Sequence, residues 1–494
     1  MARIVVVGAG VGGLATAARL AVTGHQVTVL ERADEVGGKL GRHTRDTAEG
    51  SFHFDTGPSL LTLPQVFHEL FEATGAKLDE YLDLVPLEPI VRHVFPGGPV
   101  LDSCADPAEF TDRIGVALGD RAAADWQRLW RRAGRVWRAS ERDILRRRVD
   151  SPRDLARLAW RLGDLAAIRP GQSLRGLGRT LMSDPRLRML LDRYATYTGA
   201  DPRRAPAALV AVPYAELAFG GWYLRGGLGT LADALLSRCL DLGVVVRTGT
   251  TVSRIDAVGG RVHGVRVTDS ATPIPADVVV ANVDALSVYR DLLPDPRRLA
   301  GLTDRSLAGF VLLLGVRGDS GLAHHNVFFP RHYDAEFDAV FGDPGRGRRA
   351  RPAADPTVFV TVADDPAVRP AGHEAWFVLV NAARQGTAPG AVDWRRPGLA
   401  QAYADRILDV LAERGVDVRD RLVFRDVRTP ADLATATGAP GGTIYGTAGG
   451  LLRPANRGPA RGLWLVGGSS HPGGGLPMVT LSAQIVADAI GPAW

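Results

Sequence analysis

Apolar residues near the N-terminus change their spacing twice. Residues 4–7 form an uninterrupted apolar run, which is typical of a buried strand. From Leu14 the apolar residues recur at helical spacing until Gly24, and residues 26–30 return to a strand pattern. This order predicts a strand, a helix and a second strand, which together form one β-α-β unit of a parallel sheet.

Further strand patterns lie far along the chain. Residues 244–247, 252–257, 261–268 and 277–282 are predicted strands, and residues 463–466 are a last buried strand before a helix at 476–490. Strands at 307–316, 357–363 and 374–381 are predicted to form another sheet, and residues 399–414 a helix. The pattern predicts an α/β fold whose first domain is built from discontinuous segments.

The turn between the first strand and the first helix carries candidate chemistry. It consists of Gly8, Ala9, Gly10, Val11, Gly12 and Gly13. Gly8 allows a tight turn, Gly10 lets the backbone approach a pyrophosphate, and Gly13 lets the helix pack closely on the strand. Glu31, roughly twenty residues later, ends the second strand where a carboxylate accepts hydrogen bonds from a ribose. The unit predicts a site for an adenine dinucleotide with a free ribose.

Two following segments are also candidates for the dinucleotide site. A loop with paired glycines and cations comes after Glu31, and a Gly-Pro turn comes after the loop. The candidate residues are Arg32, Gly38, Lys39, Arg42, Gly57, Pro58, Ser59 and Leu60. An ordinary polar turn has a similar composition, so that interpretation stays open. Because the loop directly follows Glu31, we favour contact of its glycines and cations with the diphosphate.

Length and composition limit the class of protein. With 494 residues the chain exceeds one usual hydrophobic core, so we expect two domains or one domain with large insertions. Cys104 and Cys239 lie far apart in no metal-ligand spacing, so we expect neither a metal site nor a disulfide framework. The early first strand leaves no room for a signal peptide, and no stretch approaches the ~20 apolar residues of a membrane span. We expect a cytoplasmic protein, either free or peripheral on the inner face of the membrane.

Residues 121–169 concentrate the positive charge. They hold fourteen arginines against six acidic residues, a local charge of +8 in a chain whose net charge is +5. Apolar residues recur there at helical spacing, and the opposite face carries Arg128, Arg131, Arg132, Arg135, Arg138 and Arg142. A second amphipathic helix is predicted around residues 155–162.

Three interpretations compete for this basic segment. The tryptophans of a packed helix would enter the core while its arginines stay solvated. A membrane-surface helix would bring the arginines to anionic headgroups at ~1 kcal/mol each. Nucleic acid is not an expected partner, because no nucleic-acid-binding fold accompanies the charge.

The motifs taken together resemble a known family. The order of the glycine turn, Glu31, the Gly-Gly-Lys loop and the segment at 54–61 is similar to the phytoene desaturases, flavin-dependent carotenoid oxidoreductases of the amine oxidase superfamily. Further matches at 222–229, 276–282 and 463–478 extend the resemblance over essentially the whole chain. The last of these, with its Gly-Gly-Ser, His-Pro-Gly and Leu-Pro-Met, is similar to the hydroxycarotenoid 3,4-desaturase branch.

The resemblance implies one FAD, bound without a covalent bond in a Rossmann-like domain. That domain is expected to comprise residues 1–75, 222–285 and 458–494, and an α+β substrate domain residues 76–221 and 286–457 with the basic helical insertion. Further cofactor contacts are expected from Val252, Gly467, Gly468, Pro477, Met478 and Val479. A helix N-terminus directed at the flavin would stabilise negative charge that develops on the ring, although glycine-rich flexibility alone is the alternative.

Catalytic candidates are fewer. Glu216 is the acid in the most apolar setting and is a candidate base or cation-stabilising residue, although a buried structural carboxylate is the alternative. Arg193 and Tyr197 come from residues 193–202, which are predicted to be a turn of the substrate domain, and His471 is a weaker candidate.

The implied reaction is desaturation of a long carotenoid-type polyene such as phytoene, neurosporene or a hydroxylated carotenoid. A hydride would pass from an allylic C–H to the flavin, and a proton would leave the neighbouring carbon. The alternatives are a flavin-dependent cis-trans carotenoid isomerase, an amine oxidase and a non-enzymatic prenyl-lipid carrier on the same fold. The intact glycine turn with Glu31 argues against a carrier, which has no need of FAD.

Overall fold

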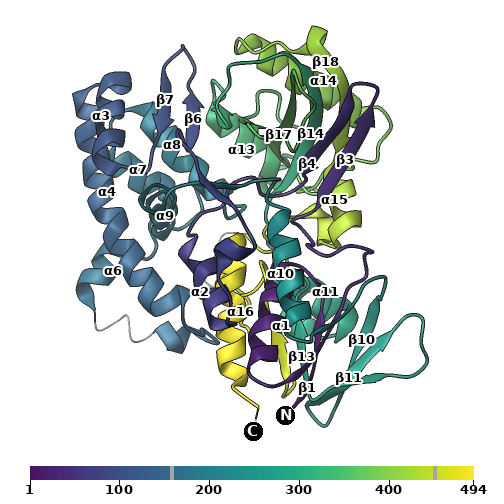
Figure 1. Ribbon diagram of the computed structural model, residues 1–494. Coiled ribbons are helices and arrows are strands. Elements are labelled where there is room, and N and C mark those ends of the chain that lie inside the picture. Colours follow the sequence, from purple (N-terminus) through teal and green to yellow (C-terminus); the bar gives the residue numbers. More distant parts are fainter. Residues whose placement is uncertain (156–160, 449–452, 494) are drawn as a thin grey trace.

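A five-stranded parallel sheet brings together strands from the N-terminal, middle and C-terminal parts of the chain. The computed structural model describes residues 1–155, 161–448 and 453–493 (Figure 1). The strands run in the order β19-β13-β1-β2-β9, and all neighbours are parallel. Their bounds are β1 (Arg3–Val7), β2 (Gln26–Leu30), β9 (Val245–Arg247), β13 (Val278–Ala281) and β19 (Leu463–Leu465).

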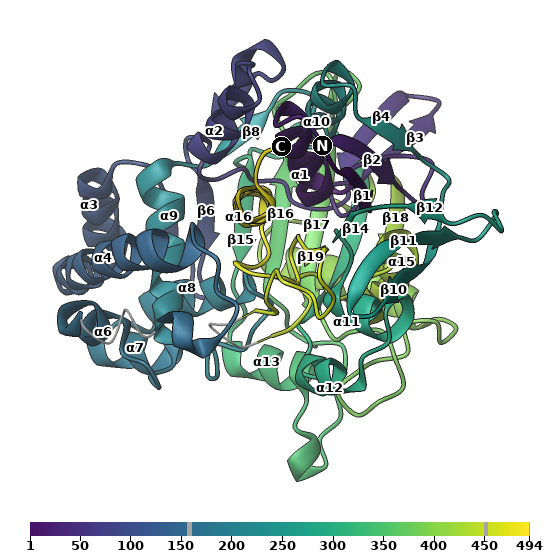
Figure 2. The same ribbon diagram turned by 90° about the horizontal axis from the view of Figure 1, so that it is seen from below.

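Helices and a small sheet cover the two faces of this parallel sheet. One face packs on α1 (Val11–Val22), α10 (Thr230–Asp241) and α16 (Leu476–Ile490), which share an apolar cluster with β1 and β2 (Figure 2). The other face packs on an antiparallel sheet of β10 (Val252–Val258), β11 (Arg261–Val267) and β12 (Ile274–Pro275). Three segments far apart in the sequence therefore form one three-layered α/β domain.

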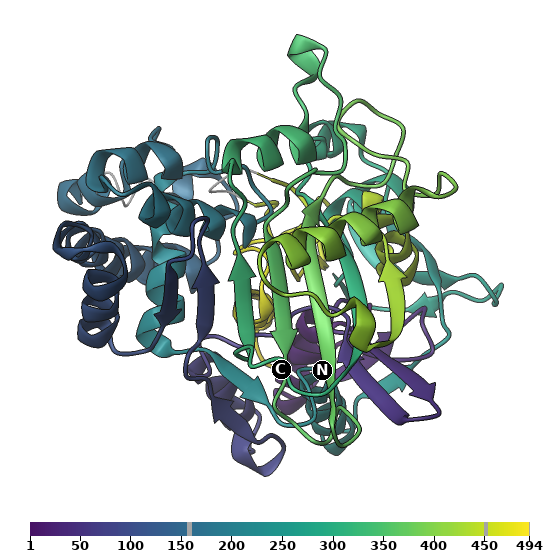
Figure 3. The ribbon, with the colours of Figure 1, turned by 90° about the horizontal axis from the view of Figure 1, so that it is seen from above.

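A second, seven-stranded mixed sheet stands above the first domain. Its order is β18-β14-β17-β16-β15-β6-β7, and only the β15-β6 pair is parallel. The strands are β6 (Val91–Val94), β7 (Val100–Ser103), β14 (Ala308–Arg317), β15 (His325–Phe328), β16 (Val358–Val362), β17 (His373–Ala382) and β18 (Leu422–Arg428). Helix α14 (Leu399–Glu413) covers one face of this sheet (Figure 3). On the other face Phe52 and Phe54 of the hairpin β3 (Arg42–Thr47) and β4 (Gly50–Asp55) contribute to an apolar cluster.

A group of helices packs beside the edge of the second sheet that β7 and β6 form. It contains α3 (Pro107–Leu118), α4 (Asp120–Ser140), α6 (Leu162–Ile168), α7 (Leu174–Leu181), α8 (Pro185–Thr196) and α9 (Ala211–Phe219), on the left in Figure 3. The remaining longer helices are α2 (Gln65–Ala73), α13 (Tyr333–Phe341) and α15 (Pro430–Thr437). None of the described helices is long and apolar enough to cross a membrane.

The structure tests one of the three interpretations of the basic segment. Helix α4 buries Trp126 and Trp137 in the core, with 1% and 6% of each residue exposed, which confirms the packed-helix interpretation for its apolar face. The assignment of Arg132 to the solvent face was wrong, since the residue is buried and donates to the carbonyl of Ala167. The predicted second helix falls largely on residues 156–160, outside the described part of the chain.

Other strand and helix predictions agree with the structure to within a residue or two. The prediction of a turn at residues 193–202 was wrong at its start, because Arg193 to Thr196 form the last turn of α8. This helix begins at an Asp184 cap followed by Pro185, and its apolar residues face the core. The correction matters because it fixes the side chains of Arg193 and Tyr197 relative to one rigid helix.

Candidate functional site

The carboxyl ends of the parallel strands gather the predicted cofactor residues. Gly8 follows β1, Glu31 follows β2, Asn282 follows β13, and Gly467 lies just after β19. In open α/β sheets, ligands bind in the crevice outside this edge. Four segments separated by up to several hundred residues therefore meet where the fold places a dinucleotide.

The glycine turn is crowded by backbone, which accounts for its composition. A Cβ on Gly13 would lie 2.1 Å from the carbonyl oxygen of Gly8, so helix α1 can approach β1 only with glycine there. A Cβ on Gly12 would lie 3.3 Å from the Cα of Gly467, and one on Gly38 would lie 3.3 Å from the Cα of Gly10. No side chain caps the N-terminus of α1, which begins at Val11, so its first N–H groups stay available to phosphate oxygens.

Asn282 joins these turns and was not among the predicted site residues. Its Nδ2 donates to the carbonyl of Gly8 at 3.3 Å, and its Oδ1 would lie 2.6 Å from a Cβ on Gly467. The only sequence signal was its position at the end of a matched strand segment. Spacing alone does not show that one amide spans two glycine turns.

Glu31 has the position expected of a ribose-binding acid. Its carboxylate accepts the backbone N–H of Ala9 at 2.7 Å and that of Ala33 at 2.9 Å, and only 8% of the residue is exposed. The carbonyl of Glu31 accepts the N–H of Thr250, which brings Val252 at the start of β10 close to the end of β2. The acid is thus fixed beside the glycine turn.

The three predicted cations each bind protein groups in this structure. Arg32 donates to the carbonyls of Thr435 and Ala436 at the end of α15, and Arg42 pairs with Asp233 at 2.5 Å. Lys39 is deeper, and its Nζ donates to the carbonyls of Thr443 and Ile444. Burial lowers the pKa of Lys39 to about 8, opposed by the carboxylate of Asp284. A contact of these cations with the diphosphate stays a prediction.

The Gly-Pro segment joins the first domain to the second sheet. A Cβ on Gly57 would lie 1.9 Å from the carbonyl oxygen of Lys39, so this glycine lets the segment pass directly against the loop, with Pro58 following it. Ser59 Oγ lies 3.2 Å from Nε2 of the buried His325 and accepts from Thr361 at 3.0 Å. Leu60 packs against the apolar cluster of the helical group.

The C-terminal segment meets the same crevice. Gly467 and Gly468 follow β19, and Pro477, Met478 and Val479 form the first turn of α16, whose N-terminus has no side-chain cap. Met478 packs toward the helical group and Val479 toward the first domain. His471 is buried and contacts the carbonyls of Ile144 and Arg147 beyond α4, which makes it a structural link.

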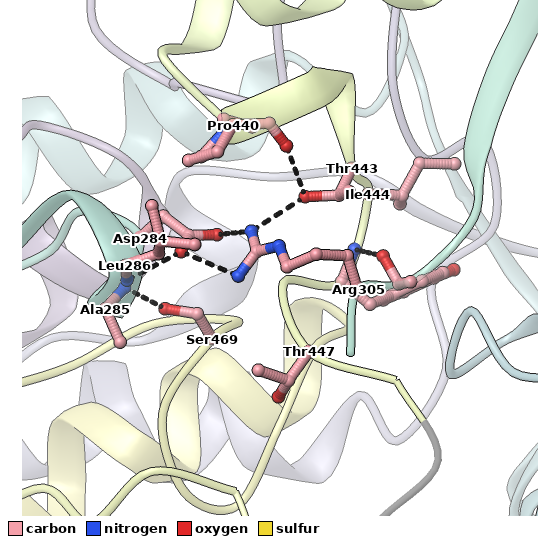
Figure 4. Close-up of polar contacts among 12 residues, drawn as sticks. Asp284, Ala285, Leu286, Arg305, Pro440, Thr443, Ile444, Thr447 and Ser469 are labelled. Atoms are coloured by element: carbon pink, nitrogen blue, oxygen red, sulfur yellow. Dashed lines mark hydrogen bonds and ion pairs between the residues drawn. The ribbon is translucent and has the colours of Figure 1, made fainter. Parts of the chain in front are cut away.

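A buried ion pair holds the loops after β13 and β19 together with the second sheet. Arg305 donates to Asp284 at 2.7 Å and to Thr443 Oγ1 at 3.0 Å, while Ser469 Oγ accepts the N–H of Ala285 (Figure 4). The side chains of Arg305 and Asp284 are each only 6% exposed. Because Lys39 donates to the backbone of Thr443, this network joins three of the segments that form the crevice.

The three catalytic candidates come together in a buried polar cluster, which we define as Arg193, Tyr194, Tyr197 and Glu216. Tyr194 donates its hydroxyl to Glu216 Oε1 at 2.7 Å, and the Arg193 guanidinium lies 4.9 Å from the centre of the Tyr197 ring. Burial and the Glu216 carboxylate raise the pKa of Tyr197, although Arg193 opposes the rise, so its phenol is protonated at neutral pH. Tyr194 was missed because only helix packing shows which tyrosine reaches Glu216.

These features fit a flavin adenine dinucleotide. Glycines without side chains let the backbone approach a diphosphate, and α1 and α16, which follow the carboxyl ends of β1 and β19, begin without side-chain caps. The buried Glu31 follows β2, where a ribose is expected in this kind of fold. Gly8, Gly10, Val11, Gly12 and Gly13 would hold the diphosphate and Glu31 the ribose, with the first turn of α16 beside the flavin. Bound there, FAD supplies a hydride acceptor.

Comparison with known proteins agrees with this site. Residues 11–306 match the family described as flavin-containing amine oxidoreductase. Over 99% of its length the chain is 34% identical to 4,4'-diapolycopene oxygenase of Methylomonas, covering 98% of that protein, and 34% identical to hydroxyneurosporene desaturase of Cereibacter sphaeroides, covering 97%.

Solved structures share the fold. An oxidoreductase from Methanosarcina mazei superposes with a TM-score of 0.64 at 17% identity, covering 98% of this chain and 100% of that one. Cyclohexylamine oxidase from Brevibacterium oxydans gives 0.61 at 16% identity, covering 99% and 98%. With its crevice, glycine turns and full-length relatives, the chain belongs to the flavin-containing amine oxidoreductase family, in its carotenoid desaturase and oxygenase group, and is an FAD-dependent oxidoreductase.

Proposed function

We propose that this enzyme desaturates a long carotenoid-type polyene, with FAD as the hydride acceptor. The observation that carries the proposal is the buried polar cluster, which combines one carboxylate with one guanidinium inside an apolar core beside the cofactor crevice. Full-length similarity to a hydroxyneurosporene desaturase supports the same substrate class. Removal of a hydride and a proton from adjacent carbons introduces one double bond.

Within the cluster, we assign the proton to Glu216. Its Oε1 accepts from Tyr194, whereas its buried Oε2 has no hydrogen-bond partner among the described residues. This oxygen retains an acceptor site for a proton that leaves the polyene. The negative charge also opposes the positive charge that develops on the polyene after hydride loss, and the face of the Tyr197 ring offers further stabilisation.

The same cluster argues against an amine oxidase. Arg193 already places a cation over the rings of Tyr197, Tyr194 and Phe359, at 4.9, 5.8 and 5.7 Å from their centres. A protonated amine among these rings would meet a like charge at short range in a region of low dielectric. A neutral polyene avoids this repulsion.

A second candidate function is oxygenation of the polyene. It is favoured by the names of relatives, since a 4,4'-diapolycopene oxygenase and several 4,4'-diaponeurosporene oxygenases are 30–34% identical over nearly the whole chain. Isomerisation of a cis double bond is a third outcome on the same site. The three reactions differ in the mass of the product.

Incubation of the purified holoprotein with phytoene, neurosporene and a hydroxylated carotenoid tests the proposal. Without oxygen, desaturation bleaches the flavin, shifts the polyene absorption to the red and removes two hydrogens from the product. A product that gains oxygen only in air would instead support the oxygenase, and an isomer of unchanged mass the isomerase. A colourless protein without flavin, or no change in any polyene, would exclude the proposed desaturase.

We also propose that the enzyme is peripheral on the inner face of the membrane and binds there through the arginines of α4. We define the arginine stripe as Arg121, Arg128, Arg131, Arg135 and Arg138 of α4 together with Arg142 just beyond its end, which recur at helical spacing and are exposed. Because Trp126 and Trp137 of α4 are buried in the protein and Trp130 is partly buried, attraction to anionic headgroups would act mainly through the arginines. Such binding would bring the enzyme to an apolar substrate that is dissolved in the bilayer.

A further inference from the structure

A polar cavity of about 800 Å³ lies at the end of the second sheet where β14 begins and β17 ends. Its walls come from four segments of the chain, within residues 201–204, 303–307, 338–348 and 384–390. Among the described residues that line it, none belongs to the predicted cofactor site or to the buried polar cluster. The volume suits a small ligand, and the proposed polyene reaction gives this cavity no role.

Charged side chains dominate the walls of the cavity. Six arginines and four aspartates line it, and five of these arginines form ion pairs with aspartates. The pairs are Arg203–Asp201, Arg203–Asp338, Arg204–Asp304, Arg305–Asp284, Arg346–Asp343 and Arg348–Asp343. The sixth arginine, Arg384, is therefore the one whose charge is not balanced by a described carboxylate.

Arg384 is held in place without an acceptor. It forms neither an ion pair nor a side-chain hydrogen bond within the part of the chain that the structure describes. The residue is half-buried, and a Cβ on Gly441 would lie 3.3 Å from the Cβ of Arg384, whereas one on Gly390 would lie 3.5 Å from its Nη2. The packed stem thus keeps the guanidinium at the cavity wall.

Arg305 adds a second positive charge to the same wall. Burial and the charge of Arg305 lower the pKa of Arg384, opposed by the carboxylate of Asp304. The two Nη groups of Arg305 donate to Asp284, and one also donates to Thr443 (Figure 4), but its Nε is buried without an acceptor among the described residues. Because the two like charges repel each other, an anion bound in the cavity would lower their electrostatic energy.

Arginines at the rim of the cavity are free to turn toward a ligand. The side chains of Arg204 and Arg346 are 66% and 79% exposed. Exposed ion pairs contribute little to stability, so these guanidinium groups can exchange an aspartate for an incoming oxyanion. The aspartates of the wall accept hydrogen bonds from hydroxyl groups. The cavity therefore combines donors for an oxyanion with acceptors for hydroxyls.

From this arrangement we propose that the cavity binds a polyol phosphate, with the phosphate on Arg384 and the hydroxyls on the aspartates of the wall. The planar guanidinium matches two phosphate oxygens. An apolar ligand would remove the charged walls from water without replacing their hydrogen bonds, and an uncharged polyol would leave Arg384 unpaired. This chemistry occurs in free esters such as glycerol 3-phosphate and in the headgroup of phosphatidylglycerol. The inference is independent of the polyene reaction.

Calorimetric titration of the FAD-loaded protein with glycerol 3-phosphate tests the site. At physiological ionic strength we expect a Kd of roughly 1 mM or below, and no binding of glycerol, which lacks the charge. Arg384→Met should weaken binding by about 10-fold or more, because the charge-assisted hydrogen bonds are lost. Arg384→Lys keeps the charge but not the planar fork, so it should retain part of the affinity.

Thermal unfolding gives a second measurement on the same proteins. Glycerol 3-phosphate should raise the unfolding temperature of the unaltered protein, since a ligand that binds only the folded state stabilises it. The ligand should leave the unfolding temperature of Arg384→Met unchanged. Without ligand this variant should unfold no earlier than the unaltered protein, because Arg384 has no partner to lose among the described residues.

Arg395→Met is the matched control. Arg395 is exposed and lies outside the cavity walls, and its replacement removes the same charge, so binding should stay unchanged. Equal loss of binding in both variants, or no binding by the unaltered protein, would overturn the site. Inorganic phosphate that binds as tightly as the ester would overturn the assignment of the hydroxyls.

Flotation with phosphatidylglycerol vesicles distinguishes the two sources of the ligand. Weaker flotation of Arg384→Met than of Arg395→Met would identify the lipid headgroup as the ligand. Equal flotation of the two variants, together with the calorimetric difference between them, would identify the free ester. Since both variants keep the arginine stripe of α4, its attraction to the vesicles cancels in this comparison.

Discussion

Glu31 shows how one side chain serves both the fold and the site. Its carboxylate accepts the N–H groups of Ala9 and Ala33, which holds the glycine turn against the end of β2. The sequence predicted this acid from its distance to the turn, but only the structure shows that backbone donors fix the carboxylate.

Replacement of Glu31 by Gln should weaken FAD binding by about 10- to 100-fold. The amide removes one acceptor oxygen and presents a donor to a backbone N–H, a loss of roughly 1–3 kcal/mol. Flavin retained after desalting and the Kd from flavin fluorescence measure the effect. Glu35→Gln, in the exposed part of the same loop, is the control, and equal flavin loss in both variants would contradict a specific role of Glu31.

His93 should make the free energy of unfolding depend on pH. Burial, with Arg193 nearby, lowers the pKa of this fully buried histidine to about 3, whereas the unfolded chain has its ordinary value of 6.5. Between these values the unfolded state binds more protons, so stability is complete above about pH 6.5 and falls as the pH decreases. The contribution lost between pH 6.5 and 4.5 is on the order of 2 kcal/mol.

Urea unfolding of His93→Gln and His263→Gln across this pH range measures the contribution. The first variant should show a shallower dependence on pH than the unaltered protein, whatever its absolute stability. The second changes an exposed histidine and should keep the original slope. Parallel curves for all three proteins would show that His93 does not titrate in this way.

At the residue scale, prediction from sequence succeeded where spacing alone defines the role. The glycines and Glu31 occupy fixed distances from a strand end, so a single chain is enough to find them. Asn282, Tyr194 and Arg305 act through partners more than twenty residues away and carry no local signal. Arg193 and Glu216 were predicted as candidate residues, but the contacts that join them in one cluster depend on helix packing.

Helix α1 and strand β1 illustrate the same limit for elements. Their bounds follow from apolar spacing and the glycine turn, and the distance between them depends on Gly13. Gly13→Ala would bring a Cβ to 2.1 Å from the Gly8 carbonyl, and since backbone cannot yield cheaply, we expect about 3 kcal/mol or more of destabilisation and little bound flavin.

Thermal unfolding with flavin release as the readout tests this change. Gly301→Ala is the control, because a Cβ there meets nothing within 4 Å. If Gly13→Ala kept both its flavin and its unfolding temperature, close contact between helix and strand would not be what requires glycine.

Three strands that were not predicted from the sequence are short or polar. Strand β3 is polar throughout, and β6 and β7 have four residues each, so none of the three strands shows a clear periodic pattern of apolar residues. They form strands because neighbours provide the partners, with β6 pairing in parallel to β15 more than two hundred residues away. Long apolar strands such as β14 and β17 were evident because their burial is nearly complete.

At the scale of the whole molecule, the apolar faces of the helices pack inward and leave charged side chains exposed on the surface. Arg121, Arg131, Arg135 and Arg138 form no ion pair with any described residue, whereas Arg128 and Arg142 are paired with aspartates. Four unpaired guanidinium groups along one exposed helix face create a positive strip that no intramolecular contact explains. The composition of the chain predicted where this charge lies. The burial of Arg132, Trp126 and Trp137 removes these three side chains from the surface that could contact a membrane.

Reversal of three of these charges should therefore release the enzyme from anionic membranes. The variant Arg131→Glu, Arg135→Glu, Arg138→Glu loses three attractions of ~1 kcal/mol each and adds repulsion, so binding should fall by at least about 100-fold. Flotation with phosphatidylglycerol vesicles measures it, and the unaltered enzyme should itself lose binding at high salt and on phosphatidylcholine, because the attraction is electrostatic. The matched control reverses Arg247, Arg297 and Arg331, which are exposed elsewhere, with the same change in net charge. If both triple variants lost binding equally, net charge rather than the arginine stripe would direct the enzyme to the membrane, and if neither did, the proposed surface would be wrong.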